Sequence, residues 1–434
     1  MLRNGRVDAL IIRVVTLGCK VNQCESASIV ATLAANGYNA SEGLEPADVY
    51  ILNTCSVTAE ADRKSRQYIG KMRKLNADCR IIIVGCSSQN KPFKFEKENV
   101  IAIGGTADKS AFISDIVDKI SFNNHYSILS DRIVFHKNDD IFNKNCCFSE
   151  EIAPISSKTR DFVKIQDGCN RFCSYCIIPY LRGRNRSRFI RSIADECKNS
   201  NSQELVLTGI DISSYGRDVG SSLTELLAEL ASISKRKRLG SFECEVIDDG
   251  LLQIMRDGEY CPHFHMSLQS GCNSVLKDMN RHYDTDYYLN KVELIRKYFP
   301  LAGITTDVIV GFPTETGEMF AETTEFVKRC EFSDIHVFPY SSREGTAAAR
   351  KYKVLSRECL SERVSALLEI RNELRRKFLT KNIGTVAPVY TEDCEGGFNV
   401  GYTPNYIKVY SNAPCGQINE LHLNAIYKDG MLGE

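Results

Sequence analysis

The segment "DGCNRFCSYCIIP" holds three cysteines in the spacing C-x3-C-x2-C, namely Cys169, Cys173 and Cys176, which we call the cluster loop. Thiolates this close along the chain can all reach one small metal centre. Zinc would need a fourth nearby Cys or His. The segment supplies none, since the next cysteine, Cys197, falls in a predicted helix. An iron–sulfur cluster held by three cysteines instead keeps one iron open for a non-protein ligand. The spacing therefore predicts a catalytic iron–sulfur cluster.

A second set of cysteines is dispersed over the first 90 residues, each following an apolar, β-rich run. The runs and their cysteines are 11–17 with Cys19, 48–53 with Cys55, and 80–85 with Cys86; we call these the strand-end cysteines. The carboxyl ends of the strands in a doubly wound sheet line one crevice. We therefore expect a second three-cysteine cluster, the alternative being buried structural cysteines.

The elements that must position these cysteines follow a β/α rhythm. Helical segments are expected near 24–36, 58–75 and 108–119, so residues 10–120 predict an α/β domain with a doubly wound parallel sheet. Residues 121–157 are polar and weakly patterned, and we expect a linker with a strand or two.

Six further apolar runs with helical segments between them predict a full or partial β/α barrel, with its chemistry at the strand ends. The runs are 162–166, 204–209, 238–243, 263–268, 304–311 and 334–340, and the clearest helices between them are 285–298 and 316–330. A long charged amphipathic helix is expected after them, over 355–382. The Gly-rich tail lacks a helical period and predicts a small all-β module. The expected divisions are 10–120, the linker 121–157, a core over 158–382, and the β module over 383–430.

Composition narrows the class of protein. With 43% hydrophobic and 25% charged residues, the 434-residue chain is typical of a soluble globular protein. Its formal net charge is zero, so a polyanion would have to meet a local basic patch. The N-terminal apolar run is too short for a signal peptide or membrane span. We expect a cytoplasmic protein whose 18 cysteines are reduced thiols.

These motifs resemble a known family. "CNRFCSYCIIP" resembles the motif of radical S-adenosylmethionine (SAM) enzymes, and "TLGCKVNQ", "NTCSVT" and "VGCSSQ" resemble their methylthiotransferase branch. "GYTPNYIKVY" is similar to a TRAM module. Within the branch, "LGCKVNQ" and "NTCSVTAEADRKSRQ" resemble enzymes acting on threonylcarbamoyladenosine beside the tRNA anticodon. The resemblance covers nearly the whole chain and implies a central partial (β/α)6 radical SAM barrel between a doubly wound N-terminal domain and a TRAM-like β module.

The resemblance also implies an activity. The enzyme would insert a methylthio group at carbon 2 of N6-threonylcarbamoyladenosine at position 37 of tRNA, using two [4Fe-4S] clusters and SAM. The cluster-loop centre would bind SAM and pass it one electron, and the 5′-deoxyadenosyl radical so formed would abstract the hydrogen at carbon 2. The centre on the strand-end cysteines would deliver sulfur, and a second SAM would supply the methyl group.

Three other functions remain open at this point. The target could be isopentenyladenosine-37 of tRNA or a ribosomal protein, both served by enzymes of the same superfamily. The third alternative is a non-enzymatic, metal-containing RNA-binding protein.

By the same resemblance, side chains at barrel strand ends would contact SAM. Tyr175 would lie near its adenine and Gly209 near its methionyl end. The further candidates on this rim are Gln269, Asp307, Gly311, Phe338 and Tyr340. Packing or turn formation is the alternative for each.

Contacts to RNA are expected from an arginine run, "YLRGRNRSRFIR", directly after the cluster loop. Its members are Arg182, Arg184, Arg186, Arg188 and Arg191, placed where phosphates or splayed bases could be held. The partner implied is a tRNA anticodon stem-loop. We also expect an external flavodoxin- or ferredoxin-like electron donor, a sulfur donor that the sequence does not identify, and a monomeric chain.

Several other cysteines and histidines are predicted to have structural roles or no specific role. Cys24 lies about one turn into the first helix and is expected to pack rather than to bind iron. His263 and His265 alternate on a predicted strand, so they line the barrel cavity or form a satisfied polar core. No role is expected for the linker cysteines Cys146 and Cys147, whereas Cys272 could lie near the SAM site.

Overall fold

The computed structural model describes residues 10–122, 135–137, 141 and 160–434. Most of the expected linker, including Cys146 and Cys147, lies outside these residues. The chain forms two compact units. Unit 1 comprises 1–155, 166–171 and 176–188, and unit 2 comprises 156–165, 172–175 and 189–434. The finer division into four segments stays a prediction.

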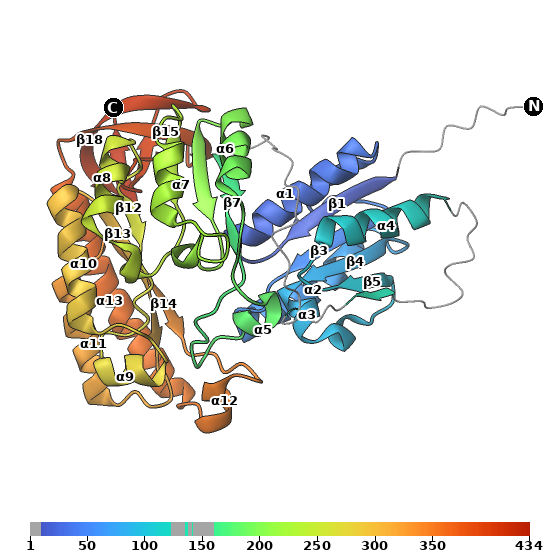
Figure 1. Ribbon diagram of the computed structural model, residues 1–434, viewed down its shortest axis with the longest axis horizontal. Coiled ribbons are helices and arrows are strands. Elements are labelled where there is room, and N and C mark those ends of the chain that lie inside the picture. The colour runs from blue at the N-terminus through green and yellow to red at the C-terminus, as the bar shows by residue number, and fades with distance from the viewer. Residues whose placement is uncertain (1–9, 123–134, 138–140, 142–159) are drawn as a thin grey trace, which may run out of the picture. The chain divides into compact units, whose positions relative to one another are not determined.

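Unit 1 contains a six-stranded, wholly parallel sheet in the order β2-β1-β3-β4-β5-β6 (Figure 1). The strands are β1 (Ile11–Thr16), β2 (Asn39–Glu42), β3 (Val49–Thr54), β4 (Arg80–Gly85), β5 (Val100–Gly104) and β6 (Phe135–Lys137). From β1 the chain adds β2 on one side of the sheet and then β3 to β6 on the other side. The position between β1 and β3 is therefore the topological switch point. Ligands of doubly wound sheets bind outside the carboxyl ends of the strands at such a point.

Helices cover both faces of this sheet, as doubly wound folds require. Helices α1 (Lys20–Ala35) and α4 (Lys109–Phe122) share one apolar cluster with one face, and α2 (Ala59–Leu75) contributes Ile69 and Met72 to the other. The smaller elements are α3 (Cys86–Asn90), α5 (Ile178–Arg182), and the pair β8 (Gln166–Asp167) and β9 (Arg186–Ser187). The expected N-terminal fold is confirmed. Strand β2 escaped sequence analysis because its residues, NASE, carry no apolar pattern.

Unit 2 contains the six barrel strands in two three-stranded parallel sheets, β7-β10-β11 and β12-β13-β14. Their bounds are β7 (Arg160–Lys164), β10 (Glu204–Thr208), β11 (Arg236–Leu239), β12 (His263–His265), β13 (Gly303–Val310) and β14 (Asp334–Pro339). Isolated bridges join β11 to the segment around β12. Among the described residues no pairing joins β7 to β14, so the expected partial barrel is confirmed and is open on that side.

Helices form the outer layer of the barrel. They include α6 (Ile190–Asn199), α7 (Leu223–Leu230), α8 (Asp249–Asp257), α10 (Thr285–Tyr298), α11 (Gly317–Cys330) and α13 (Arg357–Lys381). On β13, Val308 and Val310 join the apolar core beneath these helices. Successive side chains on a strand point to opposite faces, so Thr305, Asp307 and Ile309 line the inner wall.

The third barrel strand begins two residues earlier than expected and carries charge. We predicted 238–243 from its apolar residues, whereas β11 has the sequence RKRL. Arg236 and Arg238 lie on the inner wall, where each pairs with the buried Glu204 of β10, at 2.6 and 3.1 Å. The ion pairs replace the apolar pattern on which strand prediction depends.

The C-terminal residues of unit 2 form a closed five-stranded barrel, which confirms the all-β module. Its strands are β15 (Val386–Glu395), β16 (Phe398–Tyr402), β17 (Lys408–Ser411), β18 (Gln417–Tyr427) and β19 (Gly430–Gly433). Tyr406 stacks on His263 with ring centroids 4.4 Å apart and lies 4.7 Å from the Arg238 guanidinium. The module therefore covers the inner wall of the barrel at the amino ends of its strands. Across the described segments, no helix has both the length and the apolar character needed to span a bilayer.

Candidate iron–sulfur and radical site

The strand-end cysteines follow three neighbouring parallel strands of unit 1. Cys19 comes after β1, Cys55 after β3 and Cys86 after β4, at the carboxyl edge on and beside the switch point. Their thiols are close enough to perturb one another electrostatically. Cys19 is exposed, whereas Cys55 and Cys86 are buried. The structure thus brings together the three cysteines that sequence analysis grouped.

Two glycines permit this approach. Gly18 and Gly85, each directly before a cysteine, both adopt φ of +111°. A Cβ on Gly18 would lie 2.7 Å from the Cβ of Cys55, and one on Gly85 would lie 2.5 Å from the backbone oxygen of Thr54. Only glycine accommodates both the left-handed backbone and this proximity. The Gly-Cys pairs therefore set the turns that bring the thiols together.

Burial raises the pKa of both buried thiols, and the nearby Arg182 guanidinium opposes this rise at each. Burial raises the pKa of the Cys55 thiol to about 11. Burial also raises the pKa of Cys86, but the cationic side chains of Arg182 and Lys109 act in the opposite direction. Thiolates are the metal-binding form of cysteine, so these cations favour ligation by Cys86.

Arg182 is the centre of a buried polar network behind Cys86. Its Nε lies 3.4 Å from the Cys86 Sγ, and its terminal nitrogens donate to Glu25 at 2.8 Å, Asp167 at 3.1 Å and the Oδ1 of Asn22 at 2.9 Å. The side chain is fully buried. Its guanidinium thus links α1, α5 and β8 to a proposed cluster ligand.

The network continues to a second buried cation. Lys109 Nζ bonds to the Glu25 carboxylate at 2.5 Å and to the Oδ1 of Asn53 at 3.0 Å. Asn53 in turn donates to the backbone oxygen of Asn22. Positive side chains behind buried sulfur ligands suit an iron–sulfur cluster, because burial alone disfavours the charge of its thiolates.

The expected RNA role of Arg182 is wrong, because this side chain is enclosed by protein partners. Arg188 is also buried, and Arg186 is half-buried, with its guanidinium 3.6 Å from Asp167. Arg184 and Arg191 are exposed. The regular spacing of these arginines does not show which of them are buried and which are exposed. For Arg182 and Arg186 this depends on acidic residues that lie elsewhere in the sequence.

The cluster loop has anchors in each unit. In unit 1, the backbone N–H of Cys169 donates to the oxygen of Gly183 at 3.1 Å. In unit 2, the guanidinium of Arg281 lies 3.4 Å from the Cys173 Sγ and also pairs with Glu243. Cys169, Cys173 and Cys176 are all partly exposed. Arginine contacts to a cysteine sulfur therefore occur at both proposed cluster sites, and sequence analysis identified neither.

Tyr175 packs into an apolar cluster that includes two other predicted residues. The cluster holds Cys272, Phe312 and Tyr340, with Ile309 and Tyr175 packed against it. The rings of Phe312 and Tyr340 meet edge to face at 5.5 Å. The backbone of the loop is fixed by hydrogen bonds from Ser174 to Met279 and from Ala348 to Ser174. These contacts give Tyr175 and Tyr340 a packing role beside any contact with SAM.

The remaining candidates other than Asp307 occupy turns or the rim. Gln269 has φ of +68° and exchanges backbone hydrogen bonds with Asp307 and Ile309. Gly311 has φ of +71°, its N–H donates to Glu315 at 2.7 Å, and a Cβ there would collide with Leu360. Gly209 directly follows β10, and the Phe338 side chain on β14 is exposed. Their contacts with SAM stay predictions.

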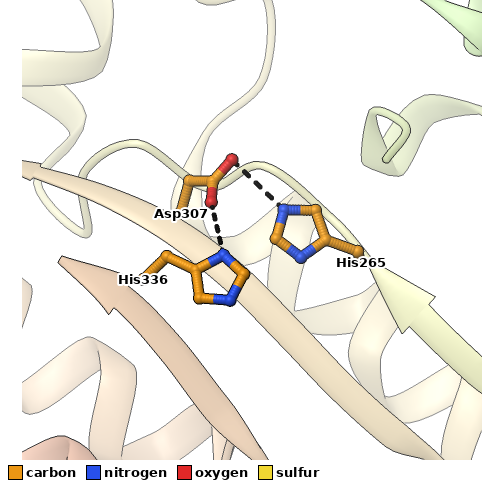
Figure 2. A group of neighbouring side chains, drawn as sticks. All are labelled: His265, Asp307 and His336. Carbon is orange, nitrogen blue, oxygen red and sulfur yellow. Dashed lines mark hydrogen bonds and ion pairs between the residues drawn. The ribbon is translucent and has the colours of Figure 1, made fainter. Parts of the chain in front are cut away.

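Asp307, which was expected to contact SAM, pairs with two histidines. Its two carboxylate oxygens lie 3.1 Å from His265 Nε2 and 3.1 Å from His336 Nδ1 (Figure 2). Burial would raise the pKa of this carboxyl group, but the two histidines outweigh burial and lower it. The sequence pattern left His265 either lining the barrel cavity or in a satisfied polar core, and it gave no sign of His336, which is distant in the sequence but pairs with Asp307 across the neighbouring strand.

Known proteins resemble this chain in the regions just described. Residues 12–104 match the model described as "Uncharacterized protein family UPF0004", and residues 163–327 match the radical SAM superfamily. The threonylcarbamoyladenosine tRNA methylthiotransferase MtaB of Bacillus subtilis is 34% identical over 96% of this chain and 93% of its own length.

Two further proteins are similar to this chain, one in sequence and one in fold. The tRNA-2-methylthio-N(6)-dimethylallyladenosine synthase of Clostridium botulinum is 34% identical over 87% of this chain and 85% of its own length. The solved radical SAM methyltransferase TsrM from Kitasatospora setae is 12% identical, with a TM-score of 0.56 over 79% of this chain and 77% of that one, which shows the fold alone. The chain belongs to the radical SAM methylthiotransferase family, in the branch of the threonylcarbamoyladenosine tRNA methylthiotransferases.

Proposed function

We propose that this protein inserts a methylthio group at carbon 2 of N6-threonylcarbamoyladenosine at position 37 of tRNA. The observation that carries the proposal is the near full-length similarity to the Bacillus subtilis enzyme of that name. The two cysteine sets support it, since the reaction needs one centre for radical chemistry and another for sulfur.

The proposed cofactors are two [4Fe-4S] clusters and SAM. The cluster-loop cysteines would hold one cluster and the strand-end cysteines the other. A reduced cluster with bound SAM supplies the radical chemistry that activates an adenine C–H bond, which no side chain can do. The residues of the chain have simpler tasks. Arg182 and Arg281 each place a cation against a ligand sulfur, and Tyr175 packs the loop against the barrel.

The proposed partners are a tRNA anticodon stem-loop and an external electron donor of the flavodoxin or ferredoxin kind. Arg184 and Arg191 are the exposed members of the arginine run and the best placed to meet phosphates. A second candidate function is methylthiolation of dimethylallyladenosine, favoured by the similarity to the Clostridium botulinum enzyme.

Nucleoside analysis of tRNA from a deletion strain tests the proposal. Loss of the gene should remove the methylthio group from threonylcarbamoyladenosine and leave dimethylallyladenosine derivatives unchanged. Complementation with the intact gene should restore it, and complementation with a Cys169→Ala variant should not. Persistence of methylthio-threonylcarbamoyladenosine in the deletion strain would overturn the proposal, and loss from dimethylallyladenosine alone would establish the second candidate.

A further inference from the structure

The inner wall of the barrel carries a hydrogen-bonded chain of polar side chains across β12, β13 and β14. The Oγ1 of Thr305 lies 3.2 Å from His263 Nε2 and 2.8 Å from His265 Nδ1. His265 continues through Asp307 to His336 (Figure 2). Apart from the SAM contact expected of Asp307, none of the roles described above for the two cysteine sets or the SAM site involves these hydrogen-bonded side chains.

His336 is the last residue of this hydrogen-bonded series, and one of its ring nitrogens is available to a ligand. Both ring nitrogens of His265 are engaged, and both oxygens of Asp307 face an imidazole. His336 uses only Nδ1. In the described part of the chain its Nε2 has no hydrogen-bond partner, and the side chain is 52% exposed. Stacking on His265, with centroids 5.2 Å apart, fixes the ring plane.

The charge of His336 is set by its neighbours. The hydrogen bond to Asp307 raises the pKa of the imidazole, the carboxylate of Asp334 adds to this effect, and burial and Arg371 oppose it. His265, on the other side of the ring, is held by Thr305. His336 is therefore biased toward the imidazolium, whose Nε2–H is a charged donor of fixed direction.

Strand β13, which carries Asp307, also contributes to the packing around an apolar cluster against which Tyr175 of the cluster loop packs. Ile309, two residues beyond Asp307 on β13, packs in the cluster that includes Tyr175. Two strand residues span about 6.6 Å, a distance comparable to the reach of an N6 substituent from an adenine ring. Strand β14, which carries His336, is also an edge strand of its three-stranded sheet among the described residues.

We propose that His336 binds the carboxylate of the N6-threonylcarbamoyl group, and that Asp307 and His265 position its ring. The inference rests on the proposed function and names the part of the nucleotide that the barrel recognises. A dimethylallyl group has no acceptor for this donor, so the contact would separate the two tRNA substrates. The three residues could also be ligands of a divalent cation, since their ligand atoms lie within 4.8 Å of one another. The test therefore includes metal analysis.

The test uses reconstituted holoenzyme and anticodon stem-loop RNAs that carry threonylcarbamoyladenosine or its carboxylate methyl ester. A charge-assisted hydrogen bond contributes about 1.5–3 kcal/mol, so His336→Gln should raise KM for the acid RNA roughly ten- to hundredfold. The turnover number and RNA-independent SAM cleavage should stay unchanged. Esterification should cost the wild type a similar factor and cost His336→Gln nothing more. His422→Gln, at an exposed position of β18, is the matched control.

A second variant tests the positioning role. Asp307→Asn removes the carboxylate that favours the imidazolium, so KM for the acid RNA should begin to rise at lower pH than in the wild type. In His336→Gln this pH dependence should vanish. Equal reductions on acid and ester RNAs, or a metal ion beyond the cluster iron that His336→Gln no longer binds, would overturn the inference. If the wild type modifies neither RNA, the proposed function fails; if it modifies both equally well, only the inference fails.

Discussion

Cys19 and Cys24 lie five positions apart, but their thiols have different surroundings. Cys19 is the exposed N-cap residue of α1, at the carboxyl end of β1. Cys24 lies inside α1 and is buried. Only Cys19 shares the edge of the sheet occupied by Cys55 and Cys86.

We predict that Cys19→Ala abolishes formation of the methylthio product, whereas Cys24→Ala retains most of it. The reason is that an alanine at position 19 removes a proposed iron ligand and an alanine at 24 removes only a packing group. Product nucleoside and iron content per reconstituted chain are the measurements. Loss of about half of the bound iron in Cys19→Ala alone would support the assignment, and the reverse pattern would contradict it.

At this scale, motif residues were predictable and their partners were not. The C-x3-C-x2-C spacing is local, and each strand-end cysteine follows an apolar run, so the sequence predicts both sets directly. Arg182 and His336 obtain their roles from residues far along the chain, namely Glu25, Asp167 and Asp307. A charged residue in a basic run and a histidine in a strand carry no local sign of such partners.

Among the elements, the turns after β1 and β4 determine whether the strand-end cysteines can meet. Both depend on a glycine with positive φ against a neighbouring strand. Most of the β/α units were predictable because their strands contain an apolar run, as β3 and β4 do. Strand β11 was displaced because its inner face is charged, and that charge is explained only by Glu204 on the adjacent strand.

We predict that Gly85→Ala destabilises the protein by about 2–3 kcal/mol and lowers its iron content. The added Cβ would lie 2.5 Å from the Thr54 backbone oxygen, on a backbone conformation that alanine rarely adopts. Unfolding in urea followed by circular dichroism measures the change, a suitable method because the chain has no Trp.

Gly70→Ala is the control for this prediction. Gly70 lies within α2 with no atom within 4 Å of its added Cβ, so alanine there should stabilise by about 0.5–1 kcal/mol. Equal effects of the two substitutions would show that the turn after β4 is not constrained as described.

On the scale of the whole molecule, a chain of zero net charge must bind tRNA through local patches. The exposed members of the arginine run are Arg184 and Arg191. Exposure identifies them as the candidates for binding phosphates, a distinction that the sequence of the run does not make.

We predict that Arg184→Ala and Arg191→Ala weaken tRNA binding, because each removes a cation that neutralises a phosphate. The salt dependence of the affinity should fall by about one unit of slope for each variant. Titration of tRNA binding across salt concentrations measures this. Arg63→Ala, which removes an exposed α2 residue paired with Glu60, serves as the comparison. Unchanged slopes for both run variants would place the RNA elsewhere.

The packing of the C-terminal module on the barrel restricts how freely the module could be exchanged between chains. Tyr406 stacks on His263, and Glu392 pairs with Arg160. Arg236 also donates to the backbone oxygen of Tyr402 at 2.7 Å. A chimera that received a foreign module would lose the Glu392 carboxylate that pairs with Arg160 and the carbonyl that accepts from Arg236, at a cost of several kcal/mol. The module and the inner residues of β7, β11 and β12 that contact it are therefore matched to one another, although they lie far apart in sequence.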